Sequence, residues 1–364
     1  MLKPTYVIPN LPPPVGIETV RVLKALTKAS RALADLKGQA KTIPNQGILI
    51  DTLALQEAKA SSEVENIVTT QDELFQADLF PDDPQSPAAK EVALYRDALR
   101  QGYARLRETG GLIPNSALIE MFRLLKDRSD GFRITPGTAL KNEQTGELVF
   151  VPPQDAREIV ANMAALEKFI NDDELCALDP LIKMALIHHQ FESIHPFPDG
   201  NGRIGRILNV LYLTRTGLLE IPVLYLSRFI TRNKADYYRH LQAVRDTGAW
   251  EDWVVYMLEA VAETSATTVE IVAGIRDQMA NVKHRMRAEL PKIYSQELLN
   301  NLFRHPYTRI EYLQSDLGVS RQTAAKYLDT LAEHGFVEKH RSGKSNYFIN
   351  VALVKLFLDV SGSL

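Results

Sequence analysis

Twelve contiguous residues, from His195 to Arg206, carry side chains suited to holding a polyphosphate beside a base. Histidine titrates near neutral pH, so His195 could take a proton from an attacking hydroxyl. Asp199 offers a hard oxygen ligand for a Mg²⁺ ion that phosphates and water also hold. Arg203 and Arg206 are three residues apart, so they share one helical face, and their guanidinium forks suit phosphate oxygens. This segment therefore predicts a phosphoryl-transfer site.

Two helices are expected to flank this segment. Between residues 180 and 194 apolar side chains recur at helical spacing, and Pro180 suits a first turn. A second apolar run spans residues 204 to 213, and Gly217 is a good stop signal. The Gly-Asn-Gly at residues 200 to 202 would open this second helix, whose free backbone N–H groups and macrodipole attract anions. Its glycines let the backbone approach the anion closely.

The segment resembles the Fic-family motif, His-x-Phe-x-(Asp/Glu)-Gly-Asn-Gly-Arg-x-x-Arg, at every fixed position. Family members transfer AMP from ATP to a hydroxyl of a target protein, whereas Doc-type kinases of the same fold diverge in the Gly-Asn-Gly stretch. The resemblance implies that His195 is the general base for a Tyr, Ser or Thr hydroxyl, that Phe197 anchors the loop in the core, and that Asp199 binds Mg²⁺. The implied ATP-binding residues are Gly200, Asn201, Gly202, Arg203, Ile204, Gly205 and Arg206, with Arg206 at the γ-phosphate.

A second motif lies at residues 61 to 66. Ser61, Glu65 and Asn66 match the inhibitory pattern (Ser/Thr)-x-x-x-Glu-(Gly/Asn) of relatives with an N-terminal inhibitory helix. The resemblance implies that Glu65 pairs with Arg206, and a carboxylate there would repel the triphosphate. The stretch from Ser62 to Glu65 also fits a helix-capping box, and the two interpretations are compatible.

Residues 133 to 153 predict a β-hairpin. The turn formers Asn142 and Gly146 precede a short apolar strand, residues 148 to 151, which Pro152 and the proline after it would stop. Relatives have a flap here that docks an extended segment of the target by strand pairing. We therefore expect a target protein, not identified by the sequence, to dock on this flap.

Tyr237 and Tyr238 follow the motif in a helical segment. In relatives, aromatic residues in this region lie near the nucleotide base. Two tyrosines on a helix also serve for ordinary packing. The sequence leaves open whether either contacts ATP, and which one.

The C-terminal residues 285 to 364 resemble a winged-helix domain, with a helix, a turn at Gly318, a second helix capped by Ser320, and a two-stranded wing over residues 337 to 348. From residue 291 onward nine Lys or Arg face seven Asp or Glu, a net of about +2, which is mild for a DNA binder. DNA contact is therefore left open beside protein docking. The residues that could contact DNA are Arg321, Gln322, Thr323, Lys326, Arg341 and Lys344.

Composition sets the remaining bounds. With 364 residues and 45% hydrophobic residues, the chain can bury a sizeable core over two or three domains. A net charge of −3 predicts no global affinity for nucleic acid or membrane, and no stretch is apolar enough to span a bilayer. The single cysteine, Cys176, excludes an internal disulfide and fits a reducing, cytoplasmic location.

We expect a mainly α protein with three parts. The first part is a helical N-terminal region (1–110), which includes an extended leader at residues 8 to 15. The second is a Fic-type core (111–265) that carries the flap, and the third is the winged helix-turn-helix (285–364). The predicted function is a protein adenylyltransferase that uses ATP and Mg²⁺ and is autoinhibited by Glu65. Two alternatives stay open, an enzyme of the same family that removes AMP and a nucleotide-sensing transcriptional regulator. Modification of the chain by itself and a homodimer are also left open.

Overall fold

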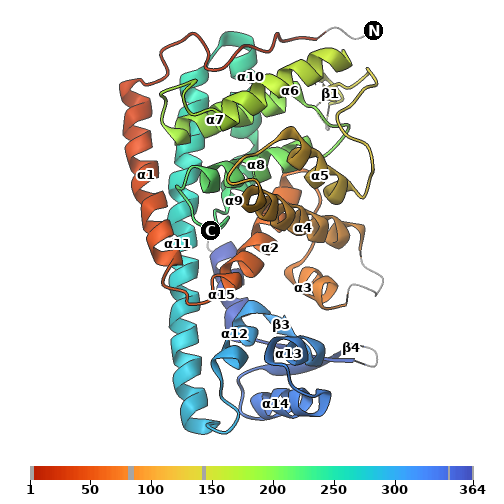
Figure 1. Cartoon of the computed structure of the whole chain (residues 1–364), viewed down its shortest axis with the longest axis vertical. Coiled ribbons are helices and arrows are strands. Elements are labelled where there is room, and N and C mark those ends of the chain that lie inside the picture. The colour runs from red at the N-terminus through yellow and green to blue at the C-terminus, as the bar shows by residue number, and fades with distance from the viewer. Residues whose placement is uncertain (1–3, 81–85, 142–144, 343–344, 363–364) are drawn as a thin grey trace.

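The structure is a computed structural model that describes residues 4–80, 86–141, 145–342 and 345–362. Within these residues the fold is mainly helical, with two small antiparallel sheets (Figure 1). The predicted fold class is therefore confirmed. None of the helices in the described part of the chain is long and apolar enough to cross a membrane.

The described N-terminal region is built from four helices, and side-chain caps set the starts of three of them. Thr19 caps the first helix, Thr70 forms a capping box with Glu73, and Ser86 caps a helix that begins with Pro87. The first helix packs along the long helix of the C-terminal half (Figure 1). The four helices are α1 (Val20–Ala40), α2 (Gly47–Val64), α3 (Gln71–Leu79) and α4 (Pro87–Glu108).

The central region holds the predicted loop between two helices. One helix ends at Ile194 and the next begins at Asn201, as the sequence predicts. The first is buried on all sides, including its polar residues His188 and Glu192, so it is the central helix of the core rather than an amphipathic surface helix. The elements are α5 (Asn115–Lys126), β1 (Leu140–Lys141), β2 (Leu148–Phe150), α6 (Ala156–Asn171), α7 (Pro180–Ile194), α8 (Asn201–Arg215), α9 (Leu226–Arg232) and α10 (Lys234–Thr247).

The strands β1 and β2 form the predicted hairpin, called the flap below. Leu140 pairs with Phe150 in antiparallel register, and Gly146 has a φ of 72°, a left-handed conformation that suits glycine. The predicted turn former Asn142 lies outside the described residues.

The C-terminal region begins with a single unbroken helix, α11 (Trp250–Glu289), which crosses the position near residue 265 where the core was expected to end. Beyond it two short helices are joined by a turn at Gly318, whose φ is 66°, and an antiparallel hairpin follows. The wing turn at Gly343 and the candidate contact Lys344 lie outside the described residues. The elements are α12 (Gln296–Arg304), β3 (Tyr307–Thr308), α13 (Ile310–Leu317), α14 (Arg321–Glu333), β4 (Glu338–Ser342), β5 (Ser345–Ile349) and α15 (Val351–Gly362), and the sheet order is β3-β5-β4.

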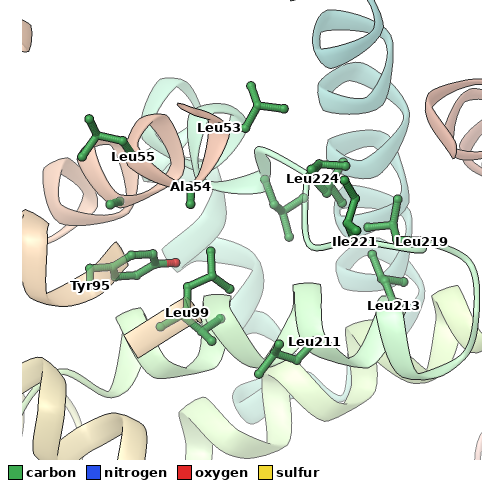
Figure 2. Packing of buried hydrophobic residues seen from close by; sticks show 14 of the residues in the cluster. Leu53, Ala54, Leu55, Tyr95, Leu99, Leu211, Leu213, Leu219, Ile221 and Leu224 are labelled. Carbon is green, nitrogen blue, oxygen red and sulfur yellow. The ribbon is translucent and has the colours of Figure 1, made fainter. Parts of the chain in front are cut away.

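An apolar cluster joins α2 to the helix after the motif loop. Side chains from α2, α4, α8 and the loop after α8 meet in it (Figure 2). Burying one such side chain contributes about 1.5–3 kcal/mol, so the cluster fixes α2 against α8. Its labelled residues are Leu53, Ala54, Leu55, Tyr95, Leu99, Leu211, Leu213, Leu219, Ile221 and Leu224.

Candidate nucleotide-binding and catalytic site

The loop between α7 and α8 is held in one conformation by its own side chains. The Asn201 amide accepts a hydrogen bond from the backbone N–H of Phe197 and donates one to its carbonyl, both at 2.8 Å. Phe197 is fully buried and stacks on Phe122 with ring centroids 4.4 Å apart. His195 and Gly200 take left-handed conformations, with φ of 49° and 72°, and turn the chain from one helix into the other. Phe197 thus lies where an anchor of the loop would lie.

His195 lies at the end of α7 with its ring partly buried. Its carbonyl accepts a hydrogen bond of 2.7 Å from Arg133 Nε, and its Nδ1 is buried with no hydrogen-bond partner among the described residues. Burial first, and then the charges of Arg133 and Arg245, lower the pKa of His195 to about 4. The imidazole is therefore neutral at pH 7 and can accept a proton.

The backbone N–H groups at the start of α8 have no side-chain cap and are suited to bind an anion. Gly200 caps the helix, and no side chain accepts from its first N–H groups. At Gly202 a Cβ atom would collide with the Glu65 carboxylate and lie 2.9 Å from Arg206 Nη1. Glycine is therefore required here for close approach of both charged groups. Ile204 and Gly205 are also buried in the first turns of α8.

Arg206 is fully buried and bonded to the end of α2. Its Nη2 lies 2.7 Å from Glu65 Oε1, its Nε donates to Ser61 Oγ at 2.8 Å, and Nη2 also donates to the Ser61 carbonyl at 2.9 Å. Burial lowers the pKa of Arg206, but the charge and hydrogen bond of Glu65, together with Tyr237 and Tyr95, outweigh it, and the pKa lies above its ordinary value. The structure thus brings together Ser61, Glu65 and Arg206, although 141 residues separate the two charges.

Glu65 is the C-cap residue of α2, directly after its last helical residue, Val64. Asn66 follows with a φ of 60°, and its side-chain oxygen accepts a hydrogen bond of 2.7 Å from Lys234. Asparagine tolerates this left-handed conformation better than most residues. The turn at Asn66 therefore stops the helix where the Glu65 carboxylate faces the motif loop.

The other two charges of the motif also have internal partners, which sequence reasoning missed. Arg203 Nη1 lies 2.5 Å from Glu91 Oε2, and Asp199 Oδ2 lies 2.6 Å from Lys126 Nζ. Both partners are single charged residues on α4 and α5 with no motif around them, so no sequence pattern pointed to either. Asp199, Arg203 and Arg206 are therefore each paired with an opposite charge of the protein.

Asp199 fits the role of a Mg²⁺ ligand. Its side chain is 60% exposed. Burial raises the pKa of Asp199, but the hydrogen bond and charge of Lys126 together outweigh it and the net pKa lies below the ordinary value. Among the described residues no group of three or more His, Cys, Asp or Glu could hold a metal. A Mg²⁺ ion here would thus take its remaining ligands from phosphates and water, as this ion commonly does.

The two predicted tyrosines lie in different environments. Tyr237 is buried, and its hydroxyl lies 2.8 Å from His188 Nε2. Tyr238 is 46% exposed, with its ring edge-to-face on Tyr237 at 5.1 Å. Of the pair, Tyr238 therefore has the ring that a nucleotide base could reach.

Three family models match this chain. "Fic/DOC family N-terminal" matches residues 23–104, "Fic/DOC family" matches residues 113–213, and "Protein adenylyltransferase SoFic-like, C-terminal domain" matches residues 278–353. The second of these spans the motif loop, and the first spans the segment that carries Glu65. The matches thus follow one another along most of the chain.

Curated relatives and solved structures agree with these matches. The chain is 28% identical over 154 residues to protein adenylyltransferase fic-1 of Caenorhabditis briggsae, covering 42% of this chain and 27% of that protein. It is 28% identical over 186 residues to a probable protein adenylyltransferase of Aquifex aeolicus, covering 50% and 54%. The chain therefore spans about a quarter to a half of the length of these curated relatives.

The fold is similar to that of a Fic family protein from Desulfovibrio desulfuricans G20, with a TM-score of 0.56 and 20% identity over 96% of this chain and 98% of that one. It is also similar to Fic-1 of Caenorhabditis elegans, with a TM-score of 0.55 and 21% identity over 71% and 74% of the two chains. At these identities the likeness shows the fold alone. With the intact motif, the fold and three consecutive family matches, the chain belongs to the Fic/DOC family.

Proposed function

We propose that this protein is an adenylyltransferase that moves AMP from ATP to a Tyr, Ser or Thr hydroxyl of a protein, and that Glu65 restrains it. The observation that carries the proposal is a neutral His195 on the short loop that leads into the N-terminus of α8, whose first turns carry two buried arginines. The curated relatives bear the name protein adenylyltransferase, which supports the reaction class.

In the proposed reaction the acceptor hydroxyl attacks the α-phosphorus of ATP. The new bond joins the hydroxyl oxygen to phosphorus, the bond from the α-phosphorus to the bridging oxygen breaks, and pyrophosphate leaves. His195 takes the hydroxyl proton, since its ring is unprotonated at pH 7. The N–H groups at the start of α8 and the guanidinium groups of Arg203 and Arg206 hold the phosphate oxygens. Asp199 would hold Mg²⁺, which when bound neutralises phosphate charge.

Restraint by Glu65 follows from where its carboxylate lies. Arg206 is the arginine that would take the γ-phosphate, and Glu65 already occupies it at 2.7 Å. A triphosphate entering with Glu65 in place would meet a like charge and lose an arginine partner, so its α-phosphate would be misplaced. Two further hydrogen bonds from Arg206 to Ser61 hold the same arginine toward α2.

The flap is the proposed docking place of the target. Leu148 and Val149 on β2 are 46% and 43% exposed, so apolar side chains face solvent on an edge strand of this two-stranded sheet. An extended segment could pair with such an edge through main-chain hydrogen bonds. The N-terminal segment already bonds Val151, the residue after β2, because the Thr5 N–H donates to the Val151 carbonyl at 3.1 Å.

Removal of AMP is the second candidate. The side chain of Glu65 is 33% exposed and faces the loop, so its carboxylate could orient a water molecule toward a protein-bound AMP. In that reaction water replaces the target hydroxyl as the attacking group. When Glu65 is lost, labelled protein would increase whether Glu65 inhibits AMP transfer or promotes AMP removal. The amount of label must therefore also be followed after free ATP is removed, when only AMP removal can change it.

The test uses wild-type protein, Glu65→Gly and Glu65→Gly/His195→Ala with Mg²⁺ and α-labelled ATP, alone and with cell lysate. We expect at least a tenfold rise in protein-bound label in the single variant and its loss in the double variant. Glu63→Gly is the matched control, because Glu63 lies in the same last turn but pairs with Lys59. Equal labelling by wild type and Glu65→Gly would remove the inhibitory role of Glu65, and no label in any sample would overturn AMP transfer.

A further inference from the structure

We propose that Arg245 is a positioning residue that fastens the flap to the end of α7 and so sets the place of the docked hydroxyl relative to His195. This inference rests on the proposed function. Arg245 belongs to no motif recognised in the sequence, and it lies in the last turn of α10, far along the chain from both elements that it joins.

Arg245 contacts both elements directly. Its guanidinium carbon lies 3.8 Å from the centre of the Phe150 ring on β2, which is a cation–π contact. Its Nε donates a hydrogen bond of 3.1 Å to Ser193 Oγ, two residues before His195. Phe150 is fully buried although its strand neighbours Leu148 and Val149 are exposed. Arg245 therefore packs against Phe150, the one buried side chain of β2.

The flap depends on such support because its own pairing is small. Strands β1 and β2 share two pairs of residues, with an irregularity between them. An isolated two-stranded hairpin is marginally stable in water. Arg133 provides a second fastening, since it donates to the carbonyls of Pro153 and His195. Two arginines thus tie the trailing end of the flap to the catalytic loop.

Arg245 also acts on His195 by its charge. The charged groups that act on His195 are Arg133, Arg245 and Glu65, and Glu192 lies about one turn earlier on α7. Arg245 lowers the pKa of His195, so its removal should raise that pKa and shift the acid limb of the rate profile to higher pH. Burial raises the pKa of Glu192 to about 7. Because Glu192 is protonated with or without Arg245 between pH 4 and 6, it does not disturb a limb measured there.

Two variants separate the mechanical role from the charge, both made in Glu65→Gly protein. Arg245→Met removes the charge and the guanidinium plane, whereas Phe150→Leu removes the ring and keeps the charge. We expect both to speed backbone hydrogen exchange over residues 148–151 by roughly tenfold or more. Both should reduce AMP transfer at saturating ATP by about tenfold, because a displaced acceptor reacts slowly. Only Arg245→Met should move the acid limb, upward by about 0.5–1 pH unit.

Controls show which idea has failed. ATP binding by calorimetry should stay within about threefold in both variants, since neither residue belongs to the anion site. Should Arg245→Met not fold, Arg245→Gln, which keeps a donor for Ser193, replaces it. Unchanged exchange over residues 148–151 in Arg245→Met would overturn the positioning role even if transfer fell. Faster hydrogen exchange in Arg245→Met, combined with no AMP transfer by the Glu65→Gly parent, would support the contact between Arg245 and the flap. It would overturn the proposed function instead.

Discussion

The catalytic loop and the C-terminal region use charge in opposite ways. Just after the loop, in the first turns of α8, Arg203 and Arg206 are buried and pair with carboxylates more than a hundred residues away. In the C-terminal region, Arg321 pairs with Glu311 only ten residues away and is 65% exposed. Breaking a buried pair leaves an uncompensated charge, whereas exposed pairs contribute about 0–1 kcal/mol. Large effects of substitution are therefore expected in the loop and small ones in the C-terminal region.

The largest effect is expected at His195. In a Glu65→Gly background, His195→Ala should lower AMP transfer by about 10²–10⁴-fold, because a positioned base contributes that much to proton transfer. ATP affinity should change little, since the phosphates are held by other groups. Labelling and calorimetry check the two parts. Loss of ATP binding would mean that His195 instead maintains the conformation of the loop. The large effect of substitution there would then reflect folding rather than catalysis.

A smaller effect is expected from Glu57, a second carboxylate on α2. It is fully buried and accepts from the Ser227 N–H at 3.0 Å and from the Tyr95 hydroxyl at 3.3 Å. Burial raises the pKa of Glu57 from 4.5 to about 7. For a pKa raised on folding, the stabilisation is complete below the unfolded value and is lost as pH rises through the folded value.

Glu57→Gln should therefore flatten the dependence of stability on pH. Between pH 5 and 8 the free energy of unfolding of the wild type should fall by roughly 1–3 kcal/mol more than that of the variant. Urea unfolding at several pH values measures it. Glu192 also titrates near pH 7, but it is present in both proteins, so its contribution cancels in the difference. Parallel curves would show that Glu57 is ionised in the fold at all these pH values.

An intermediate case joins the two regions. Asp51 on α2 is 13% exposed and pairs with Arg100 on α4 at 2.5 Å and with Arg304 on α12. Asp51→Asn should lower the melting temperature by about 2–4 °C, because two arginines lose their carboxylate at a partly buried contact. Lys339→Ala, which removes an exposed pair with Asp329, is the control and should change it by less than about 1 °C. Equal changes of melting temperature in the two variants would contradict the expectation that partly buried ion pairs contribute more to stability than exposed ones.

The sequence predicted what is local and missed what depends on packing. Proline and glycine signals placed the ends of α7 and α8 correctly, because capping is decided by neighbouring residues. The meeting of Glu65 with Arg206 could be expected only from family resemblance, since nothing local links them. Arg245 could not be found at all, because a single arginine at the end of an amphipathic helix is ordinarily a solvated residue.

The tyrosines show the same limit. Adjacent positions on a helix point in different directions, so at most one of Tyr237 and Tyr238 could face a given site. The sequence had no means to choose, because both are large aromatic residues. Packing against His188 buries Tyr237, and Tyr238 is left with the exposed ring.

The smallest effect is expected on the exposed face of α14, the helix that would enter a DNA groove. Arg321, Gln322 and Lys326 are exposed there, but Arg321 is already paired with Glu311. We expect only salt-sensitive, sequence-independent DNA binding, and Arg321→Ala should weaken it by less than about threefold at 150 mM salt. Fluorescence anisotropy with random and selected duplexes measures this. A loss of tenfold or more on one sequence alone would show that α14 reads bases, and would place a second function in the region where exposed charges otherwise contribute little.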